Sequence, residues 1–203
     1  DLPEKVLEYV IQDTQKHFLL RKDGNIINKF IGLSSIEINK ELISGNETVI
    51  KPRLDDAKFF ITKDLSNNIF NKKENLKKVI FHKKLGSVHD KIKRLATLAE
   101  HINKYYFKKN GKYFIDIIEI CKLDLISNMV VEMPKLQGYI GSYYAQKQGF
   151  NEKISNGISQ HYLPVNPEDP IPRNIDAQIV SIADKLDTVV GIFLANEKPT
   201  GTR

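Results

Sequence analysis

Asp184 is a carboxylate in apolar surroundings, which makes it the first candidate for a functional residue in this sequence. It lies in a segment with helical spacing, and most of its neighbours are aliphatic: Ile179, Val180, Ile182, Ala183 and Leu186. A carboxylate in such surroundings is costly unless it meets a metal ion, a base or a hydrogen-bond donor. His161, which lies upstream, is a candidate partner. The two residues therefore direct attention to a site inside a helical body.

A late Asp, an upstream His and a long helical body resemble the HD-domain superfamily of metal phosphohydrolases. That superfamily binds its metal through a His of the first helix, an adjacent His-Asp pair and a late Asp. In this sequence Lys91 stands where the first His belongs, and Leu123-Asp124 stands where the His-Asp pair belongs. Asp184 fills the last place, and His161 matches an accessory His. Two of the imidazoles that a metal would need are therefore replaced.

The replaced imidazoles predict a metal site that has been lost. The ammonium group of Lys91 would repel a divalent cation but could pair with Asp124 or Asp184. We therefore expect these three residues to form a structural polar cluster, with no metal and no catalytic residue in this chain. Two alternatives stay open: an active HD-type phosphohydrolase acting on nucleotides, or acids that are only surface residues or helix caps.

Positive charge is concentrated between Lys72 and Arg94. That segment has nine basic residues and only two acidic ones, Glu74 and Asp90, and so carries +7, whereas the whole chain carries +6. Clustered charge of this kind can attract a polyanion. A solvated lysine face in a chain of Lys-rich composition is the alternative. The candidate contacts to a nucleic acid are Lys77, Lys78, Lys83, Lys84, Lys91, Lys93 and Arg94.

The hydrophobic pattern predicts a mainly α protein in two parts. Residues 1–70 are expected to form a small α+β module with a helix over 2–14 and a hairpin that turns at Asp23-Gly24. A further helix over 45–65 should be kinked or broken at Pro52. Residues 71–203 are expected to form an HD-like helical bundle. Its predicted helices cover 88–108, 113–133, 136–148, 152–161 and 177–195.

Composition restricts the surroundings in which this chain works. No apolar run approaches the roughly 20 residues of a membrane span. The single cysteine, Cys121, cannot form an internal disulfide, which fits a reducing, cytoplasmic compartment, and it is expected to be buried. The chain begins at Asp1 without a Met, which we interpret as a fragment of a longer protein.

Aromatic and aliphatic residues are mostly expected in the core. The chain lacks Trp, and the spacing of its aromatic residues favours burial, which argues against a platform for stacking single-stranded nucleic acid. The apolar pairs at 59–60 and the apolar positions over 189–193 could form an exposed contact surface for another subunit. Helical apolar stripes usually face the core, so burial is the expectation here too.

Several segments together resemble the bacterial glycyl-tRNA synthetase beta subunit. The resemblance is collinear over essentially the whole chain, although Thr48 stands where that family usually has Arg. The segments that carry it are 15–18, 45–60, 81–86, 122–125, 136–145, 183–188 and 199–201.

The resemblance implies a central fragment of the beta subunit of glycine–tRNA ligase, with a degenerate HD-like domain. In that family two alpha and two beta subunits form an alpha2beta2 heterotetramer. The alpha subunit carries the active site for glycine and ATP, with Mg²⁺, and the beta subunit binds tRNA(Gly). The fragment itself would need no cofactor and no membrane. Its lysines would contact phosphates and position tRNA without reading bases. A role limited to holding the alpha subunit is the third possibility.

Overall fold

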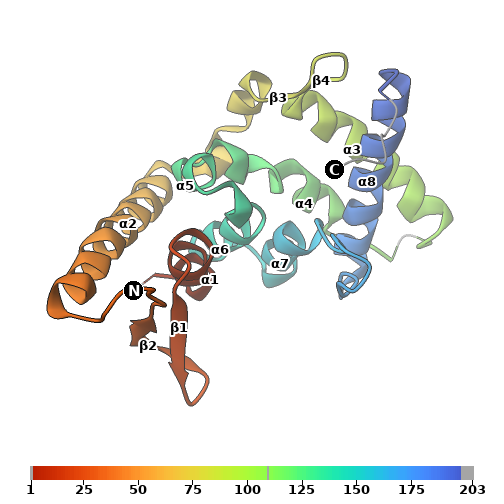
Figure 1. The fold of residues 1–203 in the computed structure, drawn as a ribbon. Helices are drawn as coiled ribbons and strands as arrows, with labels where there is room; N and C mark the ends of the chain where they lie inside the picture. The colour runs from red at the N-terminus through yellow and green to blue at the C-terminus, as the bar shows by residue number, and fades with distance from the viewer. Residues whose placement is uncertain (1, 109, 198–203) are drawn as a thin grey trace.

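The computed structural model describes residues 2–108 and 110–197, and it is mainly helical with two small two-stranded antiparallel sheets (Figure 1). The predicted fold class is therefore confirmed. The Pro199-Thr200-Gly201 string lies outside the described residues. No helix in the described part of the chain has both the length and the apolar character that a membrane crossing requires.

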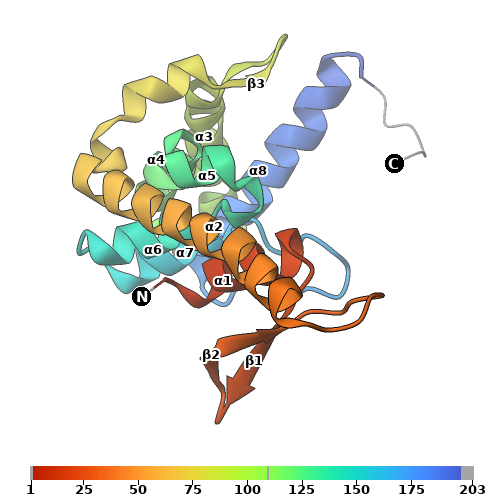
Figure 2. The same ribbon diagram turned by 60° about the vertical axis from the view of Figure 1, so that its left-hand side comes forward.

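The N-terminal segment forms a helix followed by the predicted hairpin. Helix α1 (Glu4–Glu8) continues directly as a π-helix over Tyr9–Thr14. Strands β1 (Phe18–Lys22) and β2 (Asn25–Ile31) then pair antiparallel. Asp23 and Gly24 make the turn with φ of 51° and 82°, a backbone region that Asp tolerates and Gly favours. The hairpin projects from the end of the molecule opposite to strand β3 (Ile80–His82) (Figures 1 and 2).

The long helix α2 (Lys40–Asn67) runs through Pro52 without a break. The sequence predicted a kinked or broken helix there, and the broken form is wrong. Asn39 caps the N-terminus by accepting from the amide of Leu42, and residues on both sides of Pro52 are buried against the core. A proline removes only one helical hydrogen bond from the ladder, and burial on both sides holds the helix together.

A second hairpin lies in the segment that the sequence pattern assigned to helix. Two 3₁₀ helices (Ile69–Asn71 and Lys73–Lys78) lead into strands β3 and β4 (Gly86–Ser87). Gly86 has a φ of 86° and lies close to the Asp90 side chain, so a Cβ would not fit there. The sequence pattern did not indicate this hairpin, because such short strands show no alternation of apolar and polar residues and the turn between them is charged.

The predicted single helix over 113–133 is instead three short helices. These are α4 (Phe114–Ile120), a 3₁₀ helix (Leu123–Ile126) and α5 (Asn128–Glu132). Ser127 stops the run, because its backbone is extended and its hydroxyl accepts from the Val130 amide as an N-cap. The apolar spacing is shared by all three pieces and so could not reveal the breaks.

The remaining helices complete the bundle. Helix α3 (Val88–Tyr105) packs along α8 (Ile175–Leu194), and α6 (Tyr139–Lys147) packs on α7 (Glu152–Gln160). Helix α4 contacts α3, α7 and α8, so it lies among the helices that carry the predicted site. In Figure 2 the C-terminal half of α8 extends beyond the neighbouring helices.

Asp64 joins α2 to the helical bundle. Its buried carboxylate accepts from the backbone amides of Asn128 and Met129 at 2.9 and 3.0 Å, and from the hydroxyl of Tyr144 at 3.0 Å. It therefore serves as the acceptor at the N-terminus of α5 while it holds α6. Buried residues of both predicted parts belong to one core cluster. The division into domains at residue 70 stays a prediction.

Asp64→Asn should lower the free energy of unfolding by about 3 kcal/mol, because an amide nitrogen would face donors that then lose their acceptor. Urea unfolding at neutral pH measures the loss. Asp56→Asn is the matched control on the same helix, since Asp56 is exposed. Equal stability of the two variants would contradict the role given to Asp64.

Candidate functional site

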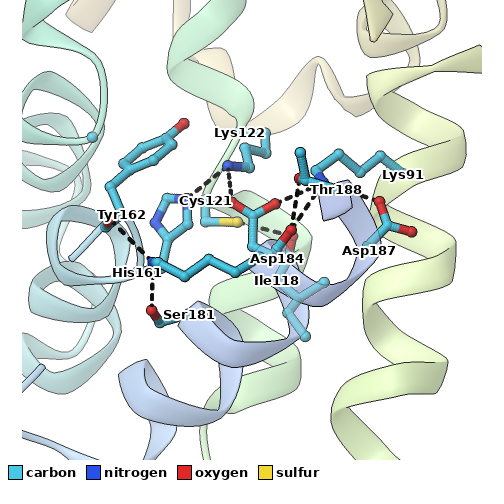
Figure 3. A network of polar contacts seen from close by, with 12 residues as sticks. Lys91, Ile118, Cys121, Lys122, His161, Tyr162, Ser181, Asp184, Asp187 and Thr188 are labelled. Atoms are coloured by element: carbon cyan, nitrogen blue, oxygen red, sulfur yellow. Dashed lines mark hydrogen bonds and ion pairs between the residues drawn. The ribbon is translucent and has the colours of Figure 1, made fainter. Parts of the chain in front are cut away.

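The helices bring four ionic side chains together inside the bundle (Figure 3). Lys91 comes from α3, Lys122 follows α4, and Asp184 and Asp187 come from α8. Lys91 and Lys122 are 3% and 5% exposed. We call these four residues the ionic cluster. Two cations and two carboxylates balance one another there, which is the condition under which such groups can be buried.

Asp184 lies between the two ammonium groups. Nζ of Lys91 is 2.9 Å from Oδ1, and Nζ of Lys122 is 2.9 Å from Oδ2. Burial alone would raise the pKa of Asp184, but the charges of Lys122 and Lys91 hold it well below its usual range. The carboxylate is therefore ionised at neutral pH and links α3, α4 and α8.

Lys91 is further fixed by the next turn of α8. Its Nζ donates to Oδ2 of Asp187 at 3.0 Å and to Oγ1 of Thr188 at 2.8 Å. Arg94 binds the outer side of Asp187, with Nε 2.6 Å from Oδ1. Asp187 thus receives one cation from inside the bundle and one from its surface.

His161 is a neutral acceptor for Lys122. The ring nitrogen Nε2 lies 2.9 Å from Nζ of Lys122, and Nδ1 lies 2.6 Å from the carbonyl of Ile158. Since an ammonium group only donates, Nε2 accepts and Nδ1 carries the proton. Burial, and then the charge of Lys122, hold the pKa of His161 well below its usual value. The Tyr162 ring lies with its centroid 4.0 Å from the same ammonium group.

Asp124 is buried apart from the ionic cluster. Its Oδ2 accepts from the Gly138 amide, ahead of α6, and Oδ1 has no hydrogen-bond partner among the described residues. Burial raises its pKa to about 6. Within the described ranges, no ion pair or hydrogen bond joins it to Lys91 or Asp184. The expected cluster of Lys91, Asp124 and Asp184 is therefore right for Lys91 with Asp184 and wrong for Asp124, whose carboxylate faces backbone amides.

This arrangement does not fit a divalent cation. The ammonium of Lys122 occupies the space between the imidazole of His161 and the carboxylate of Asp184, which is where a metal would need to be. In residues 2–108 and 110–197 no three His, Cys, Asp or Glu side chains come together as a metal-binding group. The chemistry that the cluster supports is structural: it holds helices by fixed charges.

Sequence reasoning overlooked two members of the ionic cluster. Lys122 directly precedes the Leu123-Asp124 pair that was compared with a His-Asp motif, and Asp187 ends the segment in which Asp184 drew attention. A signal existed in both cases, since each charge lies in an apolar run. Cys121, as expected, is fully buried, and burial raises the pKa of its thiol to about 12.

The predicted nucleic-acid contacts separate into exposed and buried groups. Lys91 is buried in the ionic cluster, so its predicted role as a surface contact is wrong. Arg94 is half-buried against Asp187. The other predicted contacts are exposed and lie around the β3–β4 hairpin and the N-terminal end of α3: Lys77, Lys78, Lys83, Lys84 and Lys93. We call these five residues the basic face.

Three lysines of the basic face line one groove beside the hairpin. Lys77, Lys83 and Lys93 come from the 3₁₀ helix, the turn and α3, and the groove also contains His82, His89 and Asp90. Lys77 pairs with Glu74 at the surface, whereas Lys84 donates to the carbonyl of Ala195 at 2.6 Å. The groove therefore gathers lysines from separate elements, with partial neutralisation by two acids.

Several apolar side chains that the sequence pattern placed in the core are exposed in the structure. Phe59 is 60% exposed, and Val189, Val190 and Phe193 on α8 are each more than half exposed. The last turns of α8 extend past the neighbouring helices (Figure 2), and the exposure of these side chains agrees with that arrangement. The α8 stripe over 189–193 is consequently a candidate contact surface and not part of the core.

Comparison with known proteins gives a consistent result. A family model described as glycyl-tRNA synthetase beta subunit matches residues 1–203. Similar curated proteins include the "Glycine--tRNA ligase beta subunit" of Psychromonas ingrahamii (39% identity, 99% of this chain, 30% of that protein). The proteins of the same name from Thermodesulfovibrio yellowstonii and Aquifex aeolicus are 38% and 34% identical over 99% and 100% of this chain, and again 30% of each protein is covered. The chain thus spans about 30% of the length of these relatives.

Asp124→Asn tests the pH dependence of the buried carboxyl. Because its pKa of about 6 exceeds the unfolded value, the folded state binds this proton more tightly. Its contribution to stability is therefore greatest near pH 4 and falls as the pH rises to about 6. Acidification from about pH 7.5 to about pH 4.5 should stabilise the wild type relative to the variant by about 2 kcal/mol.

Urea unfolding of both proteins at the two pH values measures this difference. The contribution of His161 to the pH dependence cancels in the comparison, because both proteins contain this residue. Asp116→Asn, at an exposed position of α4, is the control and should follow the wild type. A variant with the same pH dependence as the wild type would disprove the raised pKa.

Proposed function

The chain belongs to the glycyl-tRNA synthetase beta-subunit family, and on this premise we propose that it is a central, non-catalytic segment of a heterotetrameric glycine–tRNA ligase. In this proposal the segment supports the binding of tRNA(Gly) and the assembly of the subunits in the cytoplasm. ATP, Mg²⁺ and glycine bind to the alpha subunit, where the charging reaction takes place. The family match over the whole chain is the observation that carries the proposal.

The basic face supports the tRNA-binding part of the proposal. Its lysines are exposed and lie on three adjoining elements, so they can follow a phosphate backbone without forming a base-specific pocket. Lysine suits this task because it is a flexible point charge. The half-buried Arg94 remains a supporting residue, since it holds Asp187 and has only part of its guanidinium free for a phosphate.

The exposed α8 stripe supports the assembly part. Apolar side chains that are more than half exposed on one helix are typical of protein–protein contact surfaces, and the family name itself describes a subunit. In the proposal this stripe contacts the alpha subunit. A chain that only holds the alpha subunit, without contact to tRNA, is the competing function that this observation favours.

An active HD-type phosphohydrolase is the other alternative, and the ionic cluster argues against it. A metal-activated water needs a cation held by imidazoles and carboxylates, whereas Lys122 lies between His161 and Asp184 and pairs with both. The fixed ammonium satisfies the carboxylate that a metal would otherwise bind.

Chelation of the purified enzyme with EDTA should change the melting temperature of this segment by less than about 1 °C, because in this proposal its stability does not depend on metal binding. Elemental analysis should find no stoichiometric zinc, manganese or iron bound in the segment. Stoichiometric metal together with phosphatase activity lost on Asp184→Asn would instead establish the phosphohydrolase.

Replacing Lys77, Lys78, Lys83 and Lys84 together by Gln should weaken tRNA binding by the assembled enzyme about tenfold or more. It should also reduce the salt dependence of the affinity, because fewer counterions are released on binding. Filter binding or fluorescence anisotropy over a range of salt concentrations measures both quantities.

The control variant loses the same number of positive charges outside the basic face. In it Gln replaces four other exposed lysines: Lys22, Lys29, Lys51 and Lys58. It should bind tRNA with nearly the wild-type salt dependence. If both variants behave alike, the basic face is only a solvating surface. Pull-down of the alpha subunit with each variant separates loss of RNA contact from loss of assembly.

A further inference from the structure

Two tyrosines are displayed on the surface at the C-terminal end of α3. The side chains of Tyr105 and Tyr106 are 65% and 80% exposed, although the sequence pattern predicted that aromatic residues would lie mainly in the core. Along α3 this end is about 18 Å from Lys93, the nearest residue of the basic face on the same helix, since 12 residues separate Lys93 from Tyr105. The two tyrosines therefore form a separate surface.

The exposed ring of Tyr105 is ordered by its neighbours. The rings of His101 and Tyr105 stack with centroids 6.4 Å apart and planes 27° apart. Nδ1 of His101 lies 2.8 Å from the carbonyl of Thr97, which orients the imidazole. Nζ of Lys104 lies 5.3 Å from the Tyr105 ring centroid. The imidazole and the ammonium group thus fix the position of the Tyr105 ring, which stays largely exposed to solvent.

The backbone beneath the rings is held on both sides. The amide of Tyr106 donates to the carbonyl of Ile102 at 2.9 Å, and Phe107 packs against the core cluster. Gly111 approaches α8 so closely that an added Cβ would lie 2.7 Å from Cδ1 of Ile179. The tyrosines thus project from a fixed support, which lowers the conformational cost of binding a ligand to them.

Charge around the rings is positive. Three exposed lysines lie in the segment that follows His101 (Lys104, Lys108 and Lys112), and the exposed Glu100 that precedes His101 opposes one of these charges. The acid that reaches this region from α8 is Asp176, which is buried and accepts from the Tyr113 amide at 2.7 Å. Its charge is therefore used inside the fold, and the outer surface attracts anions.

We propose that His101, Tyr105 and Tyr106 form a platform on which unpaired bases of RNA stack, while Lys104 and Lys108 contact the adjoining phosphates. Single-stranded RNA is bound by such a combination, because bases stack on aromatic rings and lysines neutralise the backbone. The inference rests on the proposed function, since the RNA is an unpaired part of the tRNA. The platform would therefore contact bases of the tRNA that are not paired with other bases.

The assembled enzyme that carries Tyr105→Ala and Tyr106→Ala tests the platform. Its affinity for a short unstructured RNA oligonucleotide, followed by fluorescence anisotropy, should fall about tenfold or more, since stacking on each ring contributes substantially. Tyr105→Phe with Tyr106→Phe should keep nearly all of the affinity, because the rings remain. Ultraviolet crosslinking of the wild type should label the peptide that contains the two tyrosines.

Phe59→Ala is the matched control, since Phe59 is 60% exposed and has the ammonium of Lys63 5.7 Å from its ring centroid. It should leave the affinity for the oligonucleotide unchanged. Wild-type affinity in the double Ala variant would overturn the platform. So would a double Ala variant that keeps RNA binding but no longer retains the alpha subunit in a pull-down, because the tyrosines would then be a protein interface.

The outcome also separates this inference from the function on which it rests. If the four-lysine variant of the basic face loses tRNA affinity while the double Ala variant binds normally, the platform is wrong and the tRNA-binding role of the basic face stands. If neither variant changes binding to tRNA or to the oligonucleotide, both are wrong.

Discussion

The carboxylate of Asp184, held between the ammonium groups of Lys91 and Lys122, is the interaction on which the helical bundle depends. The two contacts of 2.9 Å join α3, the end of α4 and α8, and Asp187 supplies the second negative charge. Removing Asp184 would leave the buried ammonium group of Lys122 without a charged partner, which costs far more than the loss of a surface ion pair. The stability of the fold therefore depends strongly on this buried carboxylate and only weakly on the exposed lysines.

This constraint also explains where the proposed contact surfaces lie. The ionic cluster holds α3 against α8 along one side, so both ends of α3 face outward in fixed positions. The hairpin and its lysines precede the first turn of α3, whereas Tyr105 ends its last turn and Tyr106 follows directly. Asp64 adds a second attachment, because it holds α5 and α6 against α2. A surface that must meet a large, stiff RNA benefits from such a support, since little ordering is required on binding.

The sequence predicted the class of fold, the first hairpin and a pairing of Lys91 with Asp124 or Asp184, because each depends on local pattern or on a charge in apolar surroundings. It did not predict the partner of Asp124. A carboxylate in a short 3₁₀ segment can turn either to a side chain or to backbone amides, and only the packing of α6 decides between them. It also failed for Tyr105 and Tyr106, since a helical pattern does not reveal that the helix ends at the surface. Lys122 had a signal, a cation in an apolar run, that could have been used.

The ionic cluster differs from a metal site in what its cations can do. A divalent cation and a lysine ammonium can each hold carboxylates together, but a metal also binds and activates water, whereas an ammonium group with a pKa kept high by its acidic neighbour does not. Burial would lower the pKa of Lys122, and the Tyr162 and Asp184 groups outweigh that effect. A lysine ammonium in the place of a metal ion therefore still holds the helices together, but it does not supply an activated water.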